Sequence, residues 1–134
     1  MLKKKAWNAF SAYIRIRDAI RTTKTKTDLI CCTCNKKYPA FGKGCAQAGH
    51  FVAGRGNSVL FEENGVHGQC YNDNVNLKGA TTLYRFFMLE RYGEEETKRI
   101  EMNIYKVMKY TKTDLIEIRA KYKRMYKELM ESKI

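Results

Sequence analysis

Histidine is scarce in this chain of 134 residues, which contains only two, His50 and His67. Because histidine is the side chain whose ordinary pKa lies closest to neutral pH, proton transfer by imidazole is confined to these two positions. Long apolar runs are also missing, and no stretch approaches the roughly 18 apolar residues of a membrane-spanning helix. The basic start, MLKKKAWNAFSAYIRIRD, lacks the apolar core of a secretory signal, because arginines interrupt it. We therefore expect a soluble, intracellular protein with no membrane partner.

The cysteines are five, an odd number, and no recognisable signal directs the chain to an oxidising compartment. Both features argue against a framework of disulfide bonds. In a reducing compartment, clustered cysteines more often hold a metal ion. The cysteines here are Cys31, Cys32, Cys34, Cys45 and Cys70.

Acidic residues are few compared with basic ones: 14 Asp and Glu stand against 26 Lys and Arg, which gives a formal net charge of +12. A surplus of this size in a small domain favours a polyanionic partner, and nucleic acid is the first candidate. A membrane surface is a weaker candidate, because the positive charge is spread along the whole chain. The simplest alternative is a protein that merely carries many lysines.

The spacing of apolar residues predicts helices on both sides of a central segment. In Lys3–Arg21, apolar residues recur at helical intervals and basic residues fill the other face. After Gly79 the pattern is helical again, with Gly93 as a C-terminal stop. Acidic residues at Glu94–Glu96 suit the first turn of the next helix. The apolar stripe of this next helix is expected to consist of Ile100, Ile104, Val107 and Met108.

A last helix is predicted to begin where Thr113 or Asp114 can cap it. Its expected apolar stripe consists of Leu115, Ile118, Tyr122, Met125 and Leu129. The central segment, residues 29–79, contains every cysteine and histidine and is rich in glycine, which suits short strands and loops. We therefore predict a single α+β, mostly helical domain over residues 1–134, made of a basic N-terminal helix and loop (1–28), a metal-binding module (29–79) and two or three C-terminal helices (80–134).

Two pairs of potential metal ligands lie in the central segment. Cys31 and Cys34 have the spacing of a zinc knuckle, in which a tight turn lets two thiolates reach one ion. The second pair is Cys70 and Asp73, with aspartate at a position where structural zinc sites usually have cysteine. Cys32 and Cys45 are the alternatives for the fourth ligand. The competing interpretation is that free cysteines pack in a small core.

His50 and Asn74 are candidates for a second, catalytic site. His50 lies in the sequence AGHF, upstream of the second ligand pair, and Asn74 follows that pair in CYNDN. An HNH-type nuclease needs this arrangement, with an imidazole that takes a proton from water and an oxygen ligand that holds a divalent metal on the scissile phosphate. For a lone histidine a structural role is the usual alternative.

The chain resembles the phage recombination endonucleases of the NinG/Rap family. The resemblance runs in order over nearly the whole chain and rests on the stretches KAWNAFSAYIRIRD, CCTC, QAGHFVAGRGNSVLFEEN, VHGQCYNDN, NLKG and YG and on the tail helix rich in Lys and Glu. It implies a small treble-clef, ββα-metal module with an HNH-like (His-Me finger) nuclease site, acting on Holliday junctions and D-loops in the host cytoplasm. It also implies structural zinc and catalytic magnesium or manganese. A homodimer would suit symmetric cutting of two strands.

The resemblance assigns roles to particular residues. His50 is the expected base, Asn74 is the expected ligand of the catalytic metal, and the structural zinc is expected at Cys31, Cys34, Cys70 and Asp73. His67 is a further catalytic candidate, as a group that orients a phosphate, protonates the leaving oxygen or binds metal, and its alternative is a structural role. The candidate DNA contacts are Arg55, Lys78, Arg15, Arg17 and Lys43.

The chain departs from the family pattern at two positions. Asp73 replaces a cysteine, and Gly65 stands where the family has an asparagine that braces the loop of the catalytic histidine in HNH sites. Either the adjacent Asn64 takes over this role or the brace is lost. Gly49 follows the family pattern, although many HNH sites have an acidic metal ligand at this place before the histidine. The competing hypothesis is therefore a non-catalytic, zinc-containing module that binds DNA junctions.

Overall fold

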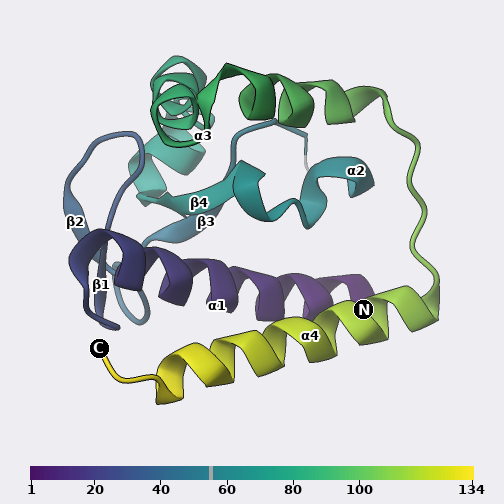
Figure 1. Cartoon of the computed structure of the whole chain (residues 1–134), viewed down its shortest axis with the longest axis horizontal. Coiled ribbons are helices and arrows are strands. Elements are labelled where there is room, and N and C mark those ends of the chain that lie inside the picture. The colour runs from purple at the N-terminus through teal and green to yellow at the C-terminus, as the bar shows by residue number, and fades with distance from the viewer. Residues whose placement is uncertain (55) are drawn as a thin grey trace.

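Helices dominate the part of the chain that the computed structural model describes, residues 1–54 and 56–134 (Figure 1). The predicted N-terminal helix is confirmed as α1 (Leu2–Thr23), and the last predicted helix as α4 (Lys112–Glu131). Both helices lie side by side and run in the same direction, although they stand at opposite ends of the sequence. Since parallel neighbours cannot be joined by a short turn, the rest of the chain forms the connection between them.

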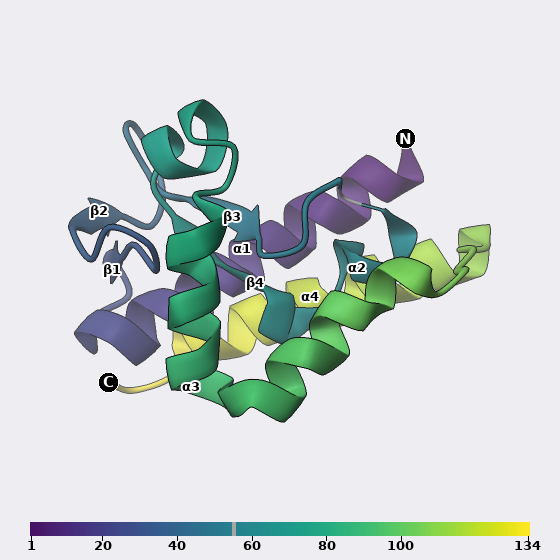
Figure 2. The same ribbon diagram turned by 90° about the horizontal axis from the view of Figure 1, so that it is seen from above.

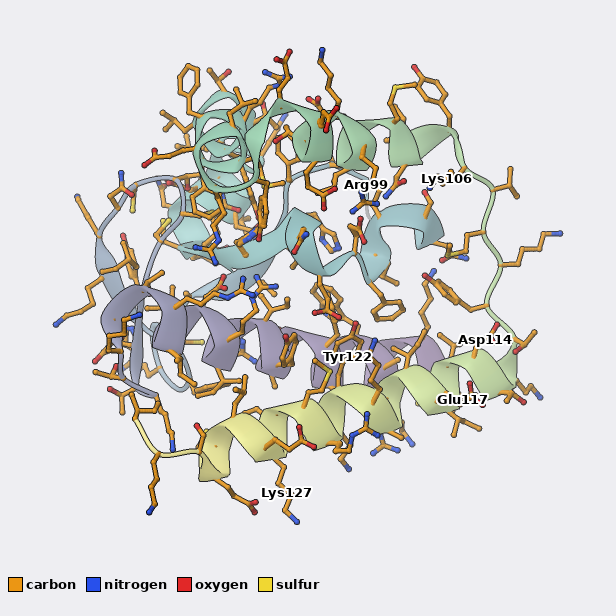
Figure 3. The ribbon with its side chains drawn as sticks, viewed as in Figure 1. Arg99, Lys106, Asp114, Glu117, Tyr122 and Lys127 are labelled. Atoms are coloured by element: carbon orange, nitrogen blue, oxygen red, sulfur yellow. The ribbon has the colours of Figure 1, made fainter. Side chains whose placement is uncertain are left out.

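Aromatic side chains hold α1 and α4 together. Phe10 and Tyr13 of α1 pack against Tyr122 of α4, with ring centroids 4.8 and 5.3 Å from that of Tyr122. Tyr122 points into the molecule, whereas Lys127 of the same helix points away from it (Figure 3). The N-cap of α4 differs from the prediction: Thr111 caps the helix in a capping box with Asp114, because its hydroxyl reaches the backbone N–H three residues on.

The central segment forms two small antiparallel sheets. Strand β1 (Asp28–Ile30) pairs with β2 (Lys37–Pro39), and β3 (Gln47–His50) pairs with β4 (Val66–Gln69). Two short turns of helix, α2 (Asn57–Leu60) and η1 (Glu63–Gly65), lie between β3 and β4. After β4 the chain enters a single π turn, η2 (Asn72–Asn76). The expected mixture of short strands and loops is thus confirmed.

The β3–β4 hairpin lies between α1 on one face and α3 on the other. Because side chains alternate between the faces of a strand, Ala48 and His50 share a face with Val66 of the partner strand. Ala48 and Val66 pack with the core residues of α1. On the opposite face, His67 contacts the aromatic rings of α3. The two histidines therefore project from opposite faces of the same hairpin.

Helix α3 (Thr81–Met102) is kinked at Gly93, whose φ of 85° lies in the left-handed region. Figure 2 shows its two halves meeting at a sharp angle. The glycine was predicted as a helix stop, and the kink at that residue agrees with the prediction. The predicted continuation of the helix through Val107 and Met108 is wrong, because α3 gives way to the 3₁₀ turn η3 (Asn103–Tyr105) and then to irregular chain.

The span between α3 and α4 explains this difference. The irregular chain runs from the end of α3 down to the start of α4 (Figure 1). Extended chain covers roughly 3.3 Å per residue against 1.5 Å in a helix, so it bridges the distance with fewer residues. Val107 is 91% exposed, so its position in the predicted apolar stripe does not lead to burial of its side chain.

A buried ion pair fixes α1 to the hairpin. Arg17 donates to Asp18, to the carbonyl oxygen of Glu63 and to that of Val66, at 2.7–2.8 Å. Asp18 in turn accepts from the backbone N–H of Gly68 at 2.7 Å. Arg17 is only 4% exposed, so its guanidinium group forms its hydrogen bonds inside the protein. It therefore cannot make the expected contact with DNA.

Within the described part of the chain, no helix combines the length and the apolarity that crossing a bilayer requires.

Candidate functional site

Four potential metal ligands converge where the two sheets meet the π turn. Cys31 and Cys34 lie in the turn between β1 and β2, Cys70 directly follows β4, and Asp73 belongs to η2. One ligand atom from each lies within 4.8 Å of all the others. The Sγ atoms of Cys34 and Cys70 are 3.9 Å apart, as are Cys31 Sγ and Asp73 Oδ2. A tetrahedral zinc ion with bonds of about 2.3 Å needs sulfur atoms about 3.8 Å apart, so the donor set fits structural zinc.

Hydrogen bonds prepare this group for a cation. The backbone N–H groups of Cys34 and Cys70 point at Cys31 Sγ, at 3.4 and 3.3 Å. Burial raises the pKa of the Cys31 thiol, but hydrogen bonds with Thr33 and with these amides outweigh it and lower the pKa below its usual value. The hydroxyl group of Thr33 donates its proton to Asp73 Oδ2 at 2.6 Å, which orients the carboxylate.

The two alternative ligands lie elsewhere. Cys32 is packed among the core residues near Tyr84 and Met88, and burial raises the pKa of its thiol well above the usual value. Cys45 lies beside Arg15, at 3.8 Å from Nη1. Among the described residues, the aspartate is therefore the fourth member of the group, as the spacing predicted.

His50 ends strand β3 and is held from two directions. The indole ring of Trp7, from α1, stacks on the imidazole with ring centroids 5.0 Å apart and an interplanar angle of 21°. His50 Nε2 lies 3.2 Å from the carbonyl oxygen of Leu60. Since a carbonyl only accepts hydrogen bonds, Nε2 carries the proton, and in the neutral ring Nδ1 is left with the lone pair of a base.

His50 and Asn74 line the same hollow, whose volume is about 300 Å³. The side-chain Nδ2 of Asn74 donates to Gln47 Oε1 at 2.7 Å, which leaves Oδ1 as the acceptor that a divalent cation prefers. No acidic side chain is present among the lining residues that the structure describes. Its other lining residues are Trp7, Ala48, Ala53, Gly54, Lys78, Gly79 and Thr81.

Gly49 has no space for the acidic ligand that many HNH sites place before the histidine. A Cβ atom at this position would lie 2.2 Å from Gln69 Oε1 and 3.0 Å from Asn74 Oδ1. Gln69 cannot easily move, since it is fully buried and donates from Nε2 to Thr33 Oγ1 and to the carbonyl oxygen of Gly79. Only glycine, which has no side chain, therefore fits between Gln69 and Asn74 at this position.

His67 is placed away from this hollow. It is 2% exposed and lies between the hydroxyl groups of Tyr84 and Tyr92. The hydroxyl group of Tyr84 donates its proton to the carbonyl oxygen of Gly49, so His67 Nδ1 must donate to the Tyr84 oxygen. In the neutral ring, His67 Nε2 then accepts a hydrogen bond from Tyr92. Burial, assisted by Arg17, lowers the pKa of His67 to about 3 despite the nearby Asp18. The geometry suits a neutral residue that joins β4 to α3 and gives no support to a catalytic role.

Asn64 does not brace the loop of His50. Its Nδ2 donates to Glu96 Oε2 of α3 at 2.8 Å. At Gly65 a Cβ atom would lie 3.1 Å from Ile100 Cγ2, so α3 leaves little space for the asparagine of the family pattern. The carbonyl group of Leu60 provides the contact with His50 instead.

The predicted DNA contacts are scattered. Lys78 lines the hollow of His50, and Lys43 is exposed in the loop between β2 and β3. Arg15 lines a second hollow of about 360 Å³. Arg17 is buried, as described above, and Arg55 lies outside the described residues.

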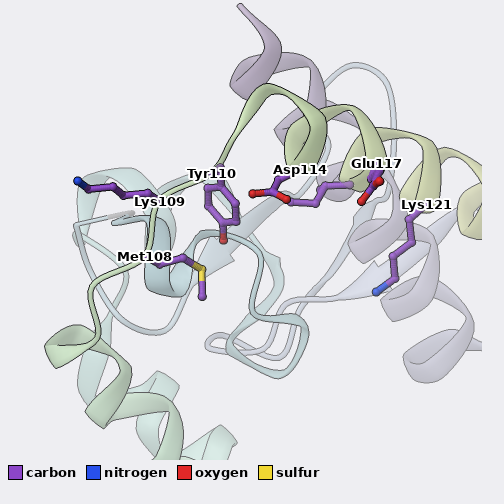
Figure 4. Close-up of a pocket in the computed structure, with 7 residues that line it drawn as sticks. Met108, Lys109, Tyr110, Asp114, Glu117 and Lys121 are labelled. Carbon is purple, nitrogen blue, oxygen red and sulfur yellow. The ribbon is translucent and has the colours of Figure 1, made fainter.

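The second hollow adjoins the first. The two share Trp7, Ala48 and Asn74, and the remaining residues of the second are Ser11, Arg15, Cys45, Ala46 and Gln47. A third hollow, of about 440 Å³, lies at the start of α4 (Figure 4). It contains the acidic Asp114 and Glu117 and shares no residue with the other two.

Sequence reasoning missed three contacts of this site. Trp7 was assigned to the apolar stripe of α1, and nothing in the stripe indicates that its ring covers His50. Gln47 was not recognised as the hydrogen-bond partner of Asn74, and Gln69 was not recognised as the side chain that packs against Gly49. The alternation of β3 and β4 places both glutamines on the face opposite His50 and is the one signal that could have grouped them.

The fold and the ligand group define a helix-rich, mixed α/β protein with three cysteines and an aspartate arranged for a metal ion. The family model described as "Bacteriophage Lambda NinG protein" matches residues 1–132, and the chain belongs to this NinG family. It is 30% identical over 131 residues to "Protein ninG" of Escherichia phage 933W and 29% identical to that of Salmonella phage P22. These matches cover 97% of the chain but only 59% and 58% of the two relatives. No solved structure matches the chain.

Proposed function

We propose that the chain is a metal-dependent DNA endonuclease of the HNH-like (His-Me finger) type that cleaves branched recombination intermediates such as Holliday junctions and D-loops in the host cytoplasm. The observation that carries the proposal is the shared hollow of His50 and Asn74, in which an oriented imidazole and an amide oxygen lie together. The surplus of positive charge and the family membership add support.

His50 acts as the general base. The carbonyl oxygen of Leu60 holds the proton on Nε2, so Nδ1 accepts a proton from water, which attacks the phosphorus in line with the leaving 3′ oxygen. Asn74 Oδ1 is the protein ligand for Mg²⁺ or Mn²⁺, with water and phosphate oxygens completing the shell. Such a cation, when bound, neutralises the charge that develops on the phosphate and on the leaving oxygen.

The ligand group of Cys31, Cys34, Cys70 and Asp73 holds a structural zinc ion. Two ligands come from the turn of one hairpin and two from the segment that follows β4, and this distribution supports the proposed treble clef. The same η2 turn carries Asn74 directly after Asp73. The ion therefore fixes the position of the catalytic asparagine by holding the residue before it.

Contacts with the sugar–phosphate backbone provide the affinity. Lys78 and Arg15 each line one of the two adjoining hollows that share Asn74, and the exposed Lys43 is a further contact in the loop between β2 and β3. Because such contacts carry no base sequence, the preference for branched DNA comes from its shape. DNA binding is then steeply weakened by salt.

The second candidate function is a non-catalytic zinc module that binds junctions. This alternative is favoured by the lack of a carboxylate among the lining residues of the His50 hollow within residues 1–54 and 56–134, since Asn74 alone is a weak metal ligand.

His50→Ala separates the two functions. The endonuclease proposal expects this variant to bind a four-way junction as tightly as the wild type and to lose at least about 100-fold in cleavage rate with Mg²⁺ or Mn²⁺, as expected on removing a general base. Lys127→Ala on the outer face of α4 is the matched control and should cleave normally. Wild-type protein that binds junctions and never cuts them would establish the binding module.

A further inference from the structure

We propose that the second hollow is a phosphate subsite in which Arg15 holds the DNA backbone next to the scissile phosphate. This inference rests on the proposed nuclease function and specifies how the strand lies: it crosses Asn74 from the hollow of His50 to that of Arg15. The subsite binds a phosphodiester oxygen through the guanidinium group.

Arg15 is held in place before any ligand arrives. Its Nε donates to the carbonyl oxygen of Ser11 at 3.3 Å, and its Nη1 donates to that of Ala40 at 3.1 Å. The guanidinium carbon lies 4.7 Å from the ring centroid of Phe41, so an aromatic face supports the planar group. A side chain fixed in this way loses little conformational entropy when it binds an anion.

One end of the guanidinium group remains for a ligand. Within residues 1–54 and 56–134, the Nη2 atom of Arg15 has no hydrogen-bond partner, and no carboxylate pairs with the side chain. A guanidinium that lacks an acidic partner and opens into a hollow is suited to a phosphate, which accepts charge-assisted hydrogen bonds from it.

The charge of the surroundings agrees with an anionic ligand. None of the described residues that line either hollow is acidic, and Arg15 and Lys78 each contribute a cation. The third hollow provides a contrast within the same molecule, because Asp114 and Glu117 offset Lys109 and Lys121 in its lining. A polyanionic strand is therefore attracted more strongly to the joined pair of hollows than to the third.

Asn74 and the side chains that position it link the two hollows. Gln47, which lines the second hollow, accepts the hydrogen bond that orients the Asn74 amide. Trp7, which stacks on His50, lines both hollows. A phosphate at Arg15 thus lies beside the same side chains that fix the catalytic geometry, as expected for the neighbouring nucleotide of one strand.

The test neutralises single phosphates of the DNA. Junctions that carry one methylphosphonate at each position around the cut are bound to wild-type protein in Ca²⁺ without Mg²⁺ or Mn²⁺. We expect one position within two nucleotides of the cut to weaken binding about tenfold or more, the loss expected for a charge-assisted hydrogen bond. Arg15→Gln should weaken binding to unmodified DNA by the same factor and should be insensitive to the modification at that position.

Three controls make the result specific. Lys127→Gln, a surface cation on the outer face of α4, should retain the full sensitivity to the modified position. Arg15→Gln should reduce the slope of log Kd against log salt concentration by about one, and Arg15→Lys should keep most of that slope. Thermal unfolding of each variant shows whether the fold persists. The series of methylphosphonate junctions uses the wild-type protein, so its result does not depend on the folding of a variant.

Each outcome decides something. Matching losses in the variant and in the modified DNA, without additivity, support the subsite. A wild-type protein that cleaves junctions but ignores every methylphosphonate near the cut overturns the subsite and leaves the nuclease function intact. A wild-type protein that neither binds nor cleaves DNA overturns the proposed function and the subsite with it. Equal competition by inorganic phosphate and by DNA phosphates would identify an adventitious anion site and also contradict the subsite.

Discussion

Trp7 stacks on His50, with ring centroids 5.0 Å apart and planes inclined by 21°. The contact joins the first helix of the chain to the end of β3 and fixes the plane of the imidazole ring. Together with the hydrogen bond from Nε2 to the carbonyl oxygen of Leu60, it determines where Nδ1 points. The N-terminal helix is thereby part of the proposed catalytic geometry and more than a support for the core.

Replacing Trp7 therefore tests the positioning of the base. Trp7→Ala should lower kcat for junction cleavage by roughly 10- to 100-fold, because a misplaced base no longer reaches the attacking water. Trp7→Phe keeps an aromatic face and should recover most of the rate. KM should change little in either variant, and steady-state kinetics measure both constants. A rise in KM with unchanged kcat in Trp7→Ala would instead identify Trp7 as a DNA contact.

The ligand group predicts one bound zinc ion for each chain. Cys34→Ser and Cys70→Ser should lose zinc and most of the folded structure, since the sheets that carry the ligands are too small to be stable without the ion. Asp73→Cys should retain zinc, because it restores the commoner ligand. Metal analysis and circular dichroism measure these effects. Cys45→Ser is the matched control, and zinc loss in this variant would show that the ligand assignment is incorrect.

The lowered pKa of His67 predicts that the protein loses stability in acid. Its pKa in the folded protein is about 3, below the ordinary 6.5 of the unfolded chain. As the pH falls from 6.5 toward 3, the unfolded state binds a proton that the folded state excludes, so the free energy of unfolding decreases by up to about 1.4 kcal/mol per pH unit from this residue. Above pH 6.5 this contribution is constant.

Denaturant unfolding of wild type and His67→Gln between pH 5 and 8 measures this effect. The variant should be less stable at neutral pH, because two tyrosine hydroxyls lose their partner, and its stability should depend less steeply on pH by about one proton. His50→Gln is the control for the other histidine. Identical pH slopes in wild type and His67→Gln would contradict the buried, neutral state of His67.

Gly49 predicts a steric cost for the acid found in other HNH sites. Gly49→Asp should destabilise the protein and should not improve metal binding, since its Cβ would collide with Gln69 Oε1. Gly49→Ala should cost about 1–3 kcal/mol, the usual range for overpacking. In Gly49→Ala/Gln69→Ala the collision is removed, so part of that loss should be recovered in denaturant unfolding. Fully additive losses would place the strain elsewhere.

Local patterns predicted the helices and the ligand group because both depend on short-range spacing. The stripe of α1 and the two pairs of ligands were readable from intervals of three or four residues. The end of α3 was not, because helical spacing continues through Val107 although no surface covers that residue. Burial depends on the path of the whole chain.

The same limit applies to the site. The roles of His50 and Asn74 were predicted from the HNH-type order of histidine, ligand pair and asparagine and from the family resemblance, and the structure places both residues in one hollow. The interior positions of Arg17 and His67 depend on contacts with residues far along the chain, such as Glu63 and Tyr92, which no local pattern reveals. Charged and polar residues are usually exposed, so their burial in ion pairs and hydrogen bonds is difficult to foresee.

A cleavage assay of wild-type protein on four-way junctions, D-loops and linear duplexes, with and without Mg²⁺ or Mn²⁺, tests the proposed nuclease function most directly. The proposed endonuclease should cut the branched substrates in the presence of the divalent metal, should cut linear duplex little, and should lose activity in His50→Ala and Asn74→Ala with binding retained. Metal-independent cutting, or tight junction binding without cleavage under any of these conditions, would contradict it.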